Sequence, residues 1–312
     1  MPNFDSPRIV LLGEPTPVHE LASLRDALGG GPRLLIKRDD AIPFGFGGNK
    51  VRKLEYVLAE ALDAGADTLV TLGGLQSNHA RATAAAAATL GMRCVLIING
   101  APQAKPTANA LLDQLLGAEI EYIPSRHERQ GATHRVMERL TAEGAKPFLI
   151  PLGASTATGA IGFVNAIGEL VGQGVAPDVI VHAGSSGGTH AGLVAGVALM
   201  RLHTRVIAVS ADDPADQIEA TVRTIIRGID ELADFDADFE IDDTRVGDGY
   251  GVPTEASREA QTMLARREGI FVDHTYTAKA MGALIAYVRE ERFSGNETVL
   301  FWHTGGQVGL FA

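Results

Sequence analysis

Residues 45–55 read GFGGNKVRKLE, in which three glycines precede a lysine and the first turns of a helix. Glycines let a backbone approach a ligand closely, and a helix N-terminus offers unpaired N–H groups and the positive end of the helix dipole. The sequence therefore places Lys50 where a ligand can bind. The helix is indicated by apolar residues at the 3.6-residue period, namely Val51, Leu54, Val57, Leu58, Ala61 and Leu62.

Lys50 has two interpretations on this local pattern. Arg52 and Lys53 are basic neighbours, and nearby positive charge disfavours the ammonium form of a lysine, as desolvation also does. The neutral amine is the form that makes a Schiff base with a carbonyl group. Most lysines, however, are solvated on a protein surface. The rest of the chain has to separate these two interpretations.

Composition limits the possible functions. The chain has 312 residues, 46% of them hydrophobic, which is enough for two domains or one large α/β unit. Its formal net charge of -11 argues against a nucleic-acid partner or an anionic membrane surface. No apolar run approaches the length of a membrane span, and residues 1–5 do not begin a secretory signal. With a single cysteine, Cys94, these features favour a cytoplasmic protein.

Short apolar runs alternate with helical patterns, which is typical of parallel sheets with helices on both faces. We expect two sheets, because this many strands and helices would make an unusually wide single sheet. Residues 47–158 are expected to form a small domain, and residues 1–46 plus 159–312 a large one. The expected strands are 33–37, 68–72, 94–98, 119–123, 148–151, 179–183, 206–210 and 298–302.

In such folds ligands bind beyond the carboxyl ends of strands, where loops meet helix N-termini. One such junction, residues 72–79, reads LGGLQSNH and opens an alanine-rich helix. Ser77 or Asn78 can serve as its N-cap. Capping does not explain four consecutive polar side chains after a double glycine. Polar groups that converge on free N–H donors suit a carboxylate ligand.

A second junction, residues 181–192, reads VHAGSSGGTHAG. Successive N–H groups in such a loop form an anion-binding nest, to which the hydroxyls of Ser185, Ser186 and Thr189 add donors. Neither a nucleotide P-loop nor the Gly-x-Gly-x-x-Gly pattern is present. The loop therefore favours the phosphate of a cofactor or a small ester, and a simple helix cap is the alternative.

A third junction, residues 301–307, reads FWHTGGQ and places Thr304 at the tip of an expected strand, although a plain strand-to-loop turn fits as well. The loops GDGYGVP and DHTYTAK present Tyr250 and Tyr276 ahead of two expected helices, where aromatics can line a site or seal a core. The chain has no His-x-x-x-His, Cys-x-x-Cys or Gly-x-Ser-x-Gly pattern, so neither a metal site nor serine hydrolase chemistry is expected.

A lysine in a glycine turn together with a separate phosphate loop resembles the arrangement of fold-type II (tryptophan-synthase β-like) pyridoxal-phosphate enzymes. Within them the chain is similar to the D-cysteine desulfhydrase and 1-aminocyclopropane-1-carboxylate deaminase family. The motifs are GGNK-x-RKLE, QSNH and G-x-GYG-x-P, and the resemblance runs from Lys37 to Gly306. It implies an α/β fold of two open, twisted, mainly parallel sheets flanked by helices, an active site in the interdomain cleft, and a homodimer.

The resemblance also implies residue roles. Lys50 would hold pyridoxal phosphate through a Schiff base, and Asn49 would contact the ring hydroxyl. Thr304 would face the ring nitrogen, where a hydroxyl cannot stabilise a pyridinium as a carboxylate does. The other implied cofactor ligands are Lys53, Asn78, Ala183, Ser185, Ser186, Gly187, Gly188 and Thr189. The implied catalytic residues are Lys50, Ser77, Tyr250 and Tyr276, and the implied substrate ligands are Ser77, Asn78, His79, Tyr250, Tyr276 and Thr277.

The implied reaction is β-elimination from a small amino acid, in which Lys50, or Ser77 acting with it, moves the Cα proton. Ring-opening deaminases of this family carry Glu and Leu where this chain has Thr277 and Thr304, so D-cysteine is the favoured substrate. L-Cysteate sulfo-lyases share the threonines and the Ala278-Lys279 pair, which keeps a lyase for sulfonated or other β-substituted amino acids as the alternative. A cofactor- or amino-acid-binding protein without turnover is the alternative outside enzymes.

Overall fold

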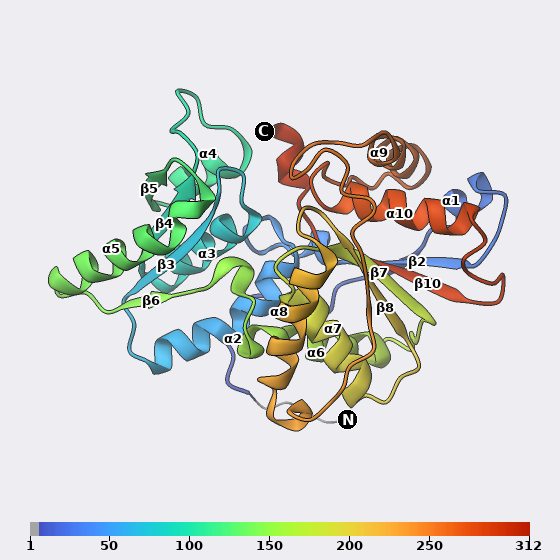
Figure 1. Cartoon of the computed structure of the whole chain (residues 1–312), viewed down its shortest axis with the longest axis horizontal. Helices are drawn as coiled ribbons and strands as arrows, with labels where there is room; N and C mark the ends of the chain where they lie inside the picture. The colour runs from blue at the N-terminus through green and yellow to red at the C-terminus, as the bar shows by residue number, and fades with distance from the viewer. Residues whose placement is uncertain (1–5) are drawn as a thin grey trace.

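The computed structural model describes residues 6–312, so the expectation about a secretory signal in residues 1–5 lies outside it. The two-sheet α/β architecture is confirmed, with one sheet on each side of the molecule in Figure 1. The first sheet has the order β1-β2-β10-β7-β8-β9 and the second the order β5-β4-β3-β6. The strands are β1 Val18–Glu20, β2 Arg33–Arg38, β3 Thr68–Gly74, β4 Arg93–Asn99, β5 Glu119–Ile123, β6 Pro147–Leu149, β7 Val179–Gly184, β8 Arg205–Ser210, β9 Glu240–Asp242 and β10 Thr298–His303.

All eight expected strands are present, because most of them are continuous apolar runs buried between helices. The sequence did not predict β1 and β9, which are three residues long and lie at the edges of the first sheet. β1 pairs antiparallel with β2, whereas the other pairs in both sheets are parallel. The helices are α1 Ala22–Ala27, α2 Asn49–Asp63, α3 Asn78–Leu90, α4 Ala108–Leu115, α5 Arg129–Ala142, α6 Ala157–Gly172, α7 Gly188–Leu199, α8 Ala215–Arg227, α9 Glu255–Glu268 and α10 Thr277–Arg289.

Helices cover both faces of each sheet. Successive side chains of a strand face opposite sides of the sheet. In the four-stranded sheet, those on one side pack against α2 and α3, and those on the other side pack against α5. The alanines in the first turns of α3 are almost completely buried, which allows this helix to approach the sheet closely. In the six-stranded sheet, α1, α9 and α10 cover one face, and α6, α7 and α8 cover the other. Within residues 6–312 no helix combines the length and the apolar character needed to cross a membrane.

The amphipathic pattern of α2 is only partly confirmed. Leu62 is 39% exposed, whereas Val51, Leu54, Val57, Leu58 and Ala61 are buried as expected. The helix is wedged against α6 as well as α3, so its polar residues Arg52, Lys53 and Glu55 are buried too. This second packing face places a charged network directly behind the glycine turn that precedes Lys50.

Asp39 and Arg52 form the centre of that network. The guanidinium of Arg52 donates from Nε and Nη2 to the two carboxylate oxygens of Asp39, both at 2.8 Å. Its Nη1 donates to Glu169 at 2.8 Å, and Trp302 Nε1 donates to Asp39 at 2.8 Å. The network, whose members are nearly inaccessible to solvent, therefore joins β10, α2 and α6.

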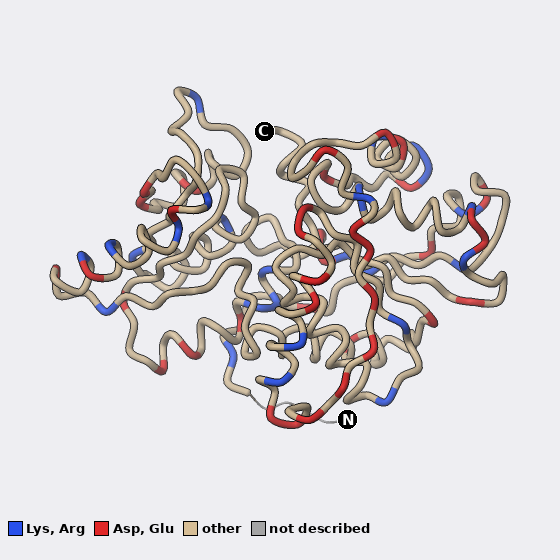
Figure 2. The backbone as a smooth tube through the Cα atoms, in the orientation of Figure 1, with Lys and Arg blue, Asp and Glu red and all other residues tan. Residues whose placement is uncertain are grey.

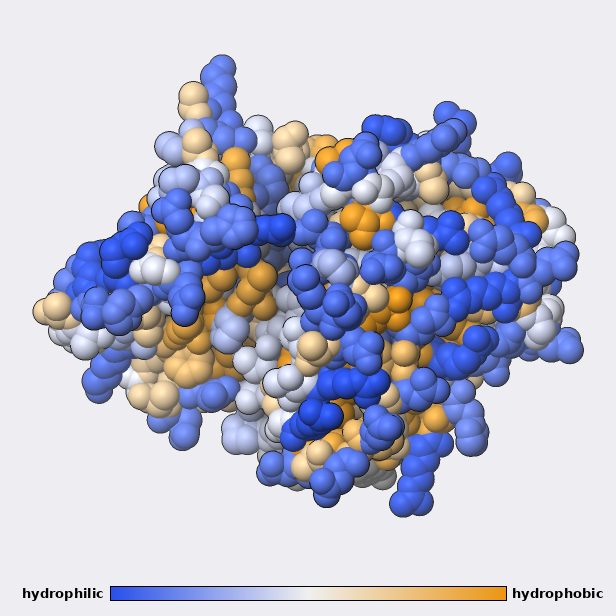
Figure 3. Space-filling model, viewed as in Figure 1, coloured by the Kyte–Doolittle hydropathy of each residue, from blue (hydrophilic) through white to orange (hydrophobic). Residues whose placement is uncertain are grey.

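The charges on the surface are unevenly distributed. The chain between residues 230 and 243 carries a run of acidic side chains without a basic one, visible as a red tract along the lower right of Figure 2. The same face is mostly hydrophilic, but apolar side chains gather in an area left of the centre and in smaller groups on the right (Figure 3). Positive charge instead accumulates inside the molecule, around the turn that leads into α2.

Candidate active site

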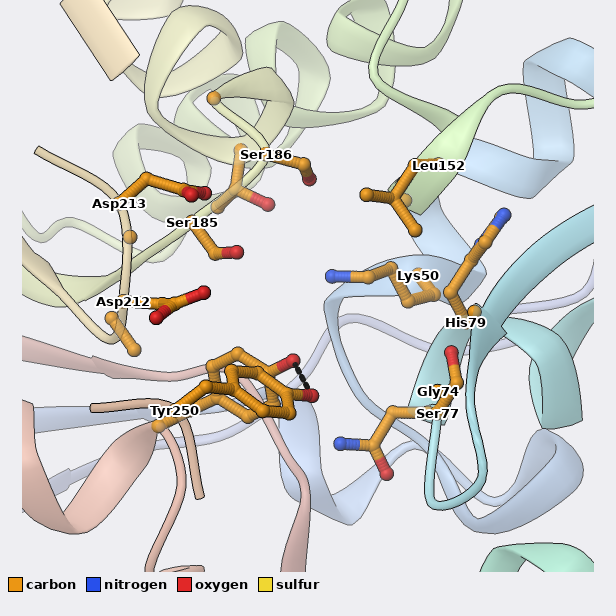
Figure 4. A pocket seen from close by; sticks show the side chains of 18 of the residues that line it. Lys50, Gly74, Ser77, His79, Leu152, Ser185, Ser186, Asp212, Asp213 and Tyr250 are labelled. Carbon is orange, nitrogen blue, oxygen red and sulfur yellow. Dashed lines mark hydrogen bonds between the residues drawn. The ribbon is translucent and has the colours of Figure 1, made fainter. Parts of the chain in front are cut away.

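A cavity of about 490 Å³ lies at the carboxyl ends of strands from both sheets (Figure 4). It receives side chains from the loops after β3, β7, β8 and β10, and from the end of β4. This is the position at which open parallel α/β sheets bind ligands. Of the residues singled out from the sequence, those that line it are Asn49, Lys50, Ser77, Asn78, His79, Ala183, Ser185, Ser186, Gly187, Thr189, Tyr250, Tyr276 and Thr304.

The glycine turn sets the position of Lys50. Gly47 and Gly48 have φ angles of 68° and 99°, which residues other than glycine rarely adopt. A Cβ on Gly48 would lie 3.0 Å from the carbonyl oxygen of Thr304, and Asn49 N donates to that same oxygen at 3.0 Å. The N-terminus of α2 is thus held against the loop after β10. Lys50 points into the cavity, where its Nζ donates to Asn49 Oδ1 at 3.1 Å (Figure 4).

The environment of Lys50 favours a neutral amine. Burial, followed by the charge of Arg81, lowers the pKa of Lys50 to about 8. The sequence-based expectation that Arg52 has this effect is wrong, because the helix turns Arg52 away towards Asp39 and Glu169. Arg81 reaches the turn from α3, donating to the carbonyl oxygens of Gly45 and Gly47. The residue that tunes the lysine is therefore distant from it in sequence.

This pKa gives a testable pH dependence. In the apoprotein, acylation of Lys50 by a small amine-reactive reagent should rise about tenfold per pH unit and level off above about pH 8, because only the neutral amine reacts. Peptide mapping by mass spectrometry measures the rate at this residue. A free lysine peptide is the reference and should level off near about pH 10.4. An inflection for Lys50 at the reference value would contradict the assigned environment.

The loop between β3 and α3 presents polar groups to the cavity. Ser77 is the N-cap of α3, since its Oγ accepts from Ala80 N at 3.1 Å. A Cβ on Gly73 would lie 2.6 Å from the Ser77 side chain, so the glycine is needed for this turn. His79 Nε2 is 2.8 Å from Thr71 Oγ1, and burial keeps the pKa of His79 well below its usual value. The Nδ1 of this neutral imidazole has no hydrogen-bond partner in the described chain.

The loop between β7 and α7 forms the expected nest. Gly187 is the N-cap of α7 in the left-handed conformation, with φ of 77°. Ser155, which the sequence did not single out, supports the nest from behind without lining the cavity. Its Oγ lies 2.8 Å from Ser186 Oγ and accepts from Gly188 N at 3.2 Å. A Cβ on Gly188 would lie 2.6 Å from that Oγ, so Gly188 supports the nest without lining the cavity.

Lys53 supplies a buried amine near the cavity. Its Nζ is inaccessible to solvent and has no hydrogen-bond partner among residues 6–312. Burial and the charge of Lys50 hold the pKa of Lys53 well below its usual value. An unsatisfied amine fits the phosphate of a bound group, because the anion would supply the missing acceptors.

Tyr250 and Tyr276 form a pair at the cavity wall opposite Ser77. Their hydroxyl oxygens are 2.6 Å apart, and their rings meet edge to face (Figure 4). Burial and Tyr250 raise the pKa of Tyr276 well above its usual value. Thr277, expected at the substrate, does not reach the cavity. It is buried at the start of α10, where its Oγ1 donates to Asp273 at 2.7 Å.

Charged residues that the sequence did not single out also line the cavity. They are Arg126, Arg129, Asp212 and Asp213. Asp212 and Asp213 follow β8 closely, so their position after a strand was an available signal. The two arginines enter from the segment after β5, and Arg126 forms an ion pair with Asp212 at 2.9 Å. This ion pair links the loops of the two sheets.

The geometry agrees with the comparison to known proteins. Residues 9–305 match the model of the pyridoxal-phosphate dependent enzyme family. The chain therefore belongs to this family, and pyridoxal phosphate is its cofactor. It is 39% identical over 316 residues to the D-cysteine desulfhydrases of Salmonella typhi and Salmonella choleraesuis, covering 98% of this chain and 96% of each relative.

Solved structures agree with this assignment. An ACC deaminase homologue, 34% identical, superposes with a TM-score of 0.91 over 98% of this chain and 94% of its own. A fungal L-serine ammonia-lyase from Rhizomucor miehei, 16% identical, shares the fold with a TM-score of 0.71 over 96% of both chains. The expected fold-type II architecture is thus confirmed.

Proposed function

We propose that the protein catalyses β-elimination from a small amino acid, with D-cysteine converted to pyruvate, sulfide and ammonia. One observation carries the proposal: Lys50, Ser77 and the Tyr250–Tyr276 pair line a single cavity. The similarity to D-cysteine desulfhydrases along nearly the whole chain supports the choice of substrate. We further propose a cytoplasmic homodimer, with residues 47–158 as the small domain, which contains every strand of the four-stranded sheet.

The residues that would hold the cofactor surround Lys50. The nest from Ser185 to Thr189, with Ala183, Asn78 and Lys53, would bind its phosphate, and Asn49 would contact its ring hydroxyl. Thr304 would face the ring nitrogen, and this hydroxyl leaves the ring largely neutral. When bound, pyridoxal phosphate supplies an electron sink for charge developed at the substrate Cα.

The chain itself binds the substrate and moves protons. Ser77 and the free N–H groups at the start of α3 bind the substrate carboxylate. The Lys50 amine takes the proton from Cα, which its lowered pKa permits near neutral pH. Tyr276 keeps its own proton, because its pKa is raised, and donates a hydrogen bond to the substrate beside Tyr250. His79 lies close to Ser77 as a neutral imidazole and completes the substrate-binding surface.

The holoenzyme should be assayed for ammonia and keto acid with D- and L-cysteine, D- and L-cysteate, serine, β-chloroalanine and 1-aminocyclopropane-1-carboxylate. The highest kcat/KM is expected for D-cysteine. A higher value for L-cysteate would transfer the proposal to a sulfo-lyase, whose threonine pattern this chain shares at Thr277 and Thr304. A yellow protein that releases ammonia from none of these compounds would refute the enzymatic proposal.

Replacing Tyr276 with phenylalanine should lower kcat about 10²- to 10³-fold, because the substituted ring no longer donates a hydrogen bond to the reacting substrate. The visible spectrum of the bound cofactor should stay unchanged, since the ring still packs against Tyr250. Steady-state kinetics with D-cysteine measure the loss. Tyr122→Phe on β5, remote from the cavity, is the matched control and should behave as wild type. A loss of less than about threefold in Tyr276→Phe would remove this residue from the mechanism.

A further inference from the structure

Three lysine or arginine side chains line the cavity within residues 6–312: Lys50, Arg126 and Arg129. The cofactor requires Lys50, and Arg126 already has a carboxylate partner in Asp212. Arg129 remains. Its Nε donates to Asn99 Oδ1 at 3.1 Å, its Nη2 donates to the same oxygen, and Asn99 is uncharged. Across residues 6–312 no carboxylate lies within 4.0 Å of its guanidinium nitrogens, Asp213 in the same cavity included.

The position of Arg129 relates it to one part of the substrate. Asn99 is the last residue of β4 and is paired in register with Gly74, at the start of the loop that presents Ser77. Tyr250 and Tyr276 line the same cavity as Arg129, and burial lowers the pKa of Arg129. Arg129 is therefore held at the end of the strand next to the carboxylate-binding loop, in the cavity that the tyrosine pair also lines.

We infer that Arg129 binds the anionic group attached to Cβ of the substrate, an inference that rests on the proposed β-elimination. The α-carboxylate is already matched by Ser77 and the N–H groups of α3, so the remaining cation is available for a second negative charge. A guanidinium is delocalised, remains charged when partly buried, and donates several hydrogen bonds to one anion. The chemical class is a β-substituent that carries negative charge or gains it, such as a sulfonate or a thiolate.

The role of Arg129 differs between these two sources. A sulfonate is charged before reaction, so Arg129 contributes to substrate binding. A thiol gains its charge when the C–S bond breaks and both bonding electrons go to sulfur, so Arg129 stabilises the leaving hydrosulfide. In the first case the loss of Arg129 raises KM, and in the second it lowers kcat. Arg129 forms no covalent bond and transfers no proton in either case.

The test compares the Arg129→Met and Arg129→Lys holoenzymes with cysteine, cysteate and β-chloroalanine. The last is uncharged at Cβ when it binds and loses chloride, a very weak base whose departure needs little stabilisation by a cation. Arg129→Met should lower kcat/KM for cysteine and for cysteate about 10- to 100-fold relative to β-chloroalanine. Arg129→Lys should recover part of this loss because it retains the charge. Arg135→Met, on an exposed position of the same helix, is the matched control and should leave all three values unchanged.

Retained turnover of β-chloroalanine shows that Arg129→Met is folded and loaded. An equal change for all three substrates, or no change, would overturn the inference while leaving the proposed function intact. If the wild type turns over none of them, the proposed function fails, and spectral titration of the bound cofactor with cysteate and alanine then decides on Arg129. Tighter binding of cysteate than of alanine by the wild type, lost in Arg129→Met, would support the anion site. Equal affinities of the wild type for cysteate and alanine would refute it.

Discussion

Replacing Lys50 with alanine is expected to lower turnover by about 10⁴-fold or more, and to remove the visible absorbance of the bound cofactor. The size follows from the two functions that the change removes. The amine is the covalent attachment point of the cofactor, and it is the group that takes the Cα proton, a contribution of roughly 10²–10⁴ by itself. No other lysine lines the cavity within residues 6–312, so none replaces it.

Two variants control this experiment. Lys50→Arg retains a positively charged side chain of similar length near Asn49 Oδ1 but cannot form a Schiff base. It should therefore lose absorbance and turnover as Lys50→Ala does. Lys146→Ala, on the surface beside β6, should retain both. Spectra, reduction with borohydride followed by peptide mapping, and kinetics provide the readouts. A cofactor still trapped by reduction in Lys50→Ala would show that another residue attaches it.

Replacing Asp39 with alanine is expected to lower the free energy of unfolding by about 3 kcal/mol, the lower end of the cost of breaking a buried ion pair, because Arg52 keeps Glu169 as its second partner. Arg52 loses two hydrogen bonds of 2.8 Å, and Trp302 Nε1 loses its acceptor. Water cannot compensate, because Asp39 is fully buried and Arg52 is 2% exposed. Urea unfolding at a fixed concentration of free cofactor measures the change, since cofactor binding also stabilises the fold.

An exposed ion pair provides the contrast. Glu20 and Arg33 are 2.8 Å apart, but their side chains are 46% and 58% exposed, so Glu20→Gln should leave the free energy of unfolding close to that of the wild type. If Asp39→Ala and Glu20→Gln changed the free energy of unfolding equally, the buried network would contribute no more to stability than an exposed ion pair. Asp39→Asn should fall close to Asp39→Ala, because the amide retains the shape but not the charge.

The sequence predicted those parts of the fold that local patterns determine. The strands at the centre of each sheet are continuous apolar runs, and each was identified, whereas β1 and β9 are short and form only by pairing with a neighbour. Leu62 was assigned to the buried face of α2, although neighbouring elements leave it 39% exposed. The hydrophobic period of a helix identifies its apolar face. It does not show whether another element covers that face at the end of the helix.

The same distinction applies to the site. Glycine loops after strands pointed to Ser77 and Ser186, as the glycine turn before α2 pointed to Lys50, because each turn and its polar residues are adjacent in sequence. Arg81 and Arg129 have no such marker. They become part of the site only because the helices that carry them are brought against distant loops. Thr277 was misplaced for the opposite reason, since a residue next to Tyr276 in sequence faces another direction at the start of a helix.

The strand order β2-β10-β7 has a consequence for the order of folding during synthesis. β2 joins the parallel part of its sheet only through β10, so residues 33–38 have no parallel partner until residues 298–303 have left the ribosome. The four-stranded sheet, complete by residue 149, can form much earlier. The oxygen of Thr304 that holds Asn49 is synthesised after Lys50, Ser77 and both tyrosines, so a nascent chain lacks the completed turn before Lys50 until residue 304 has left the ribosome.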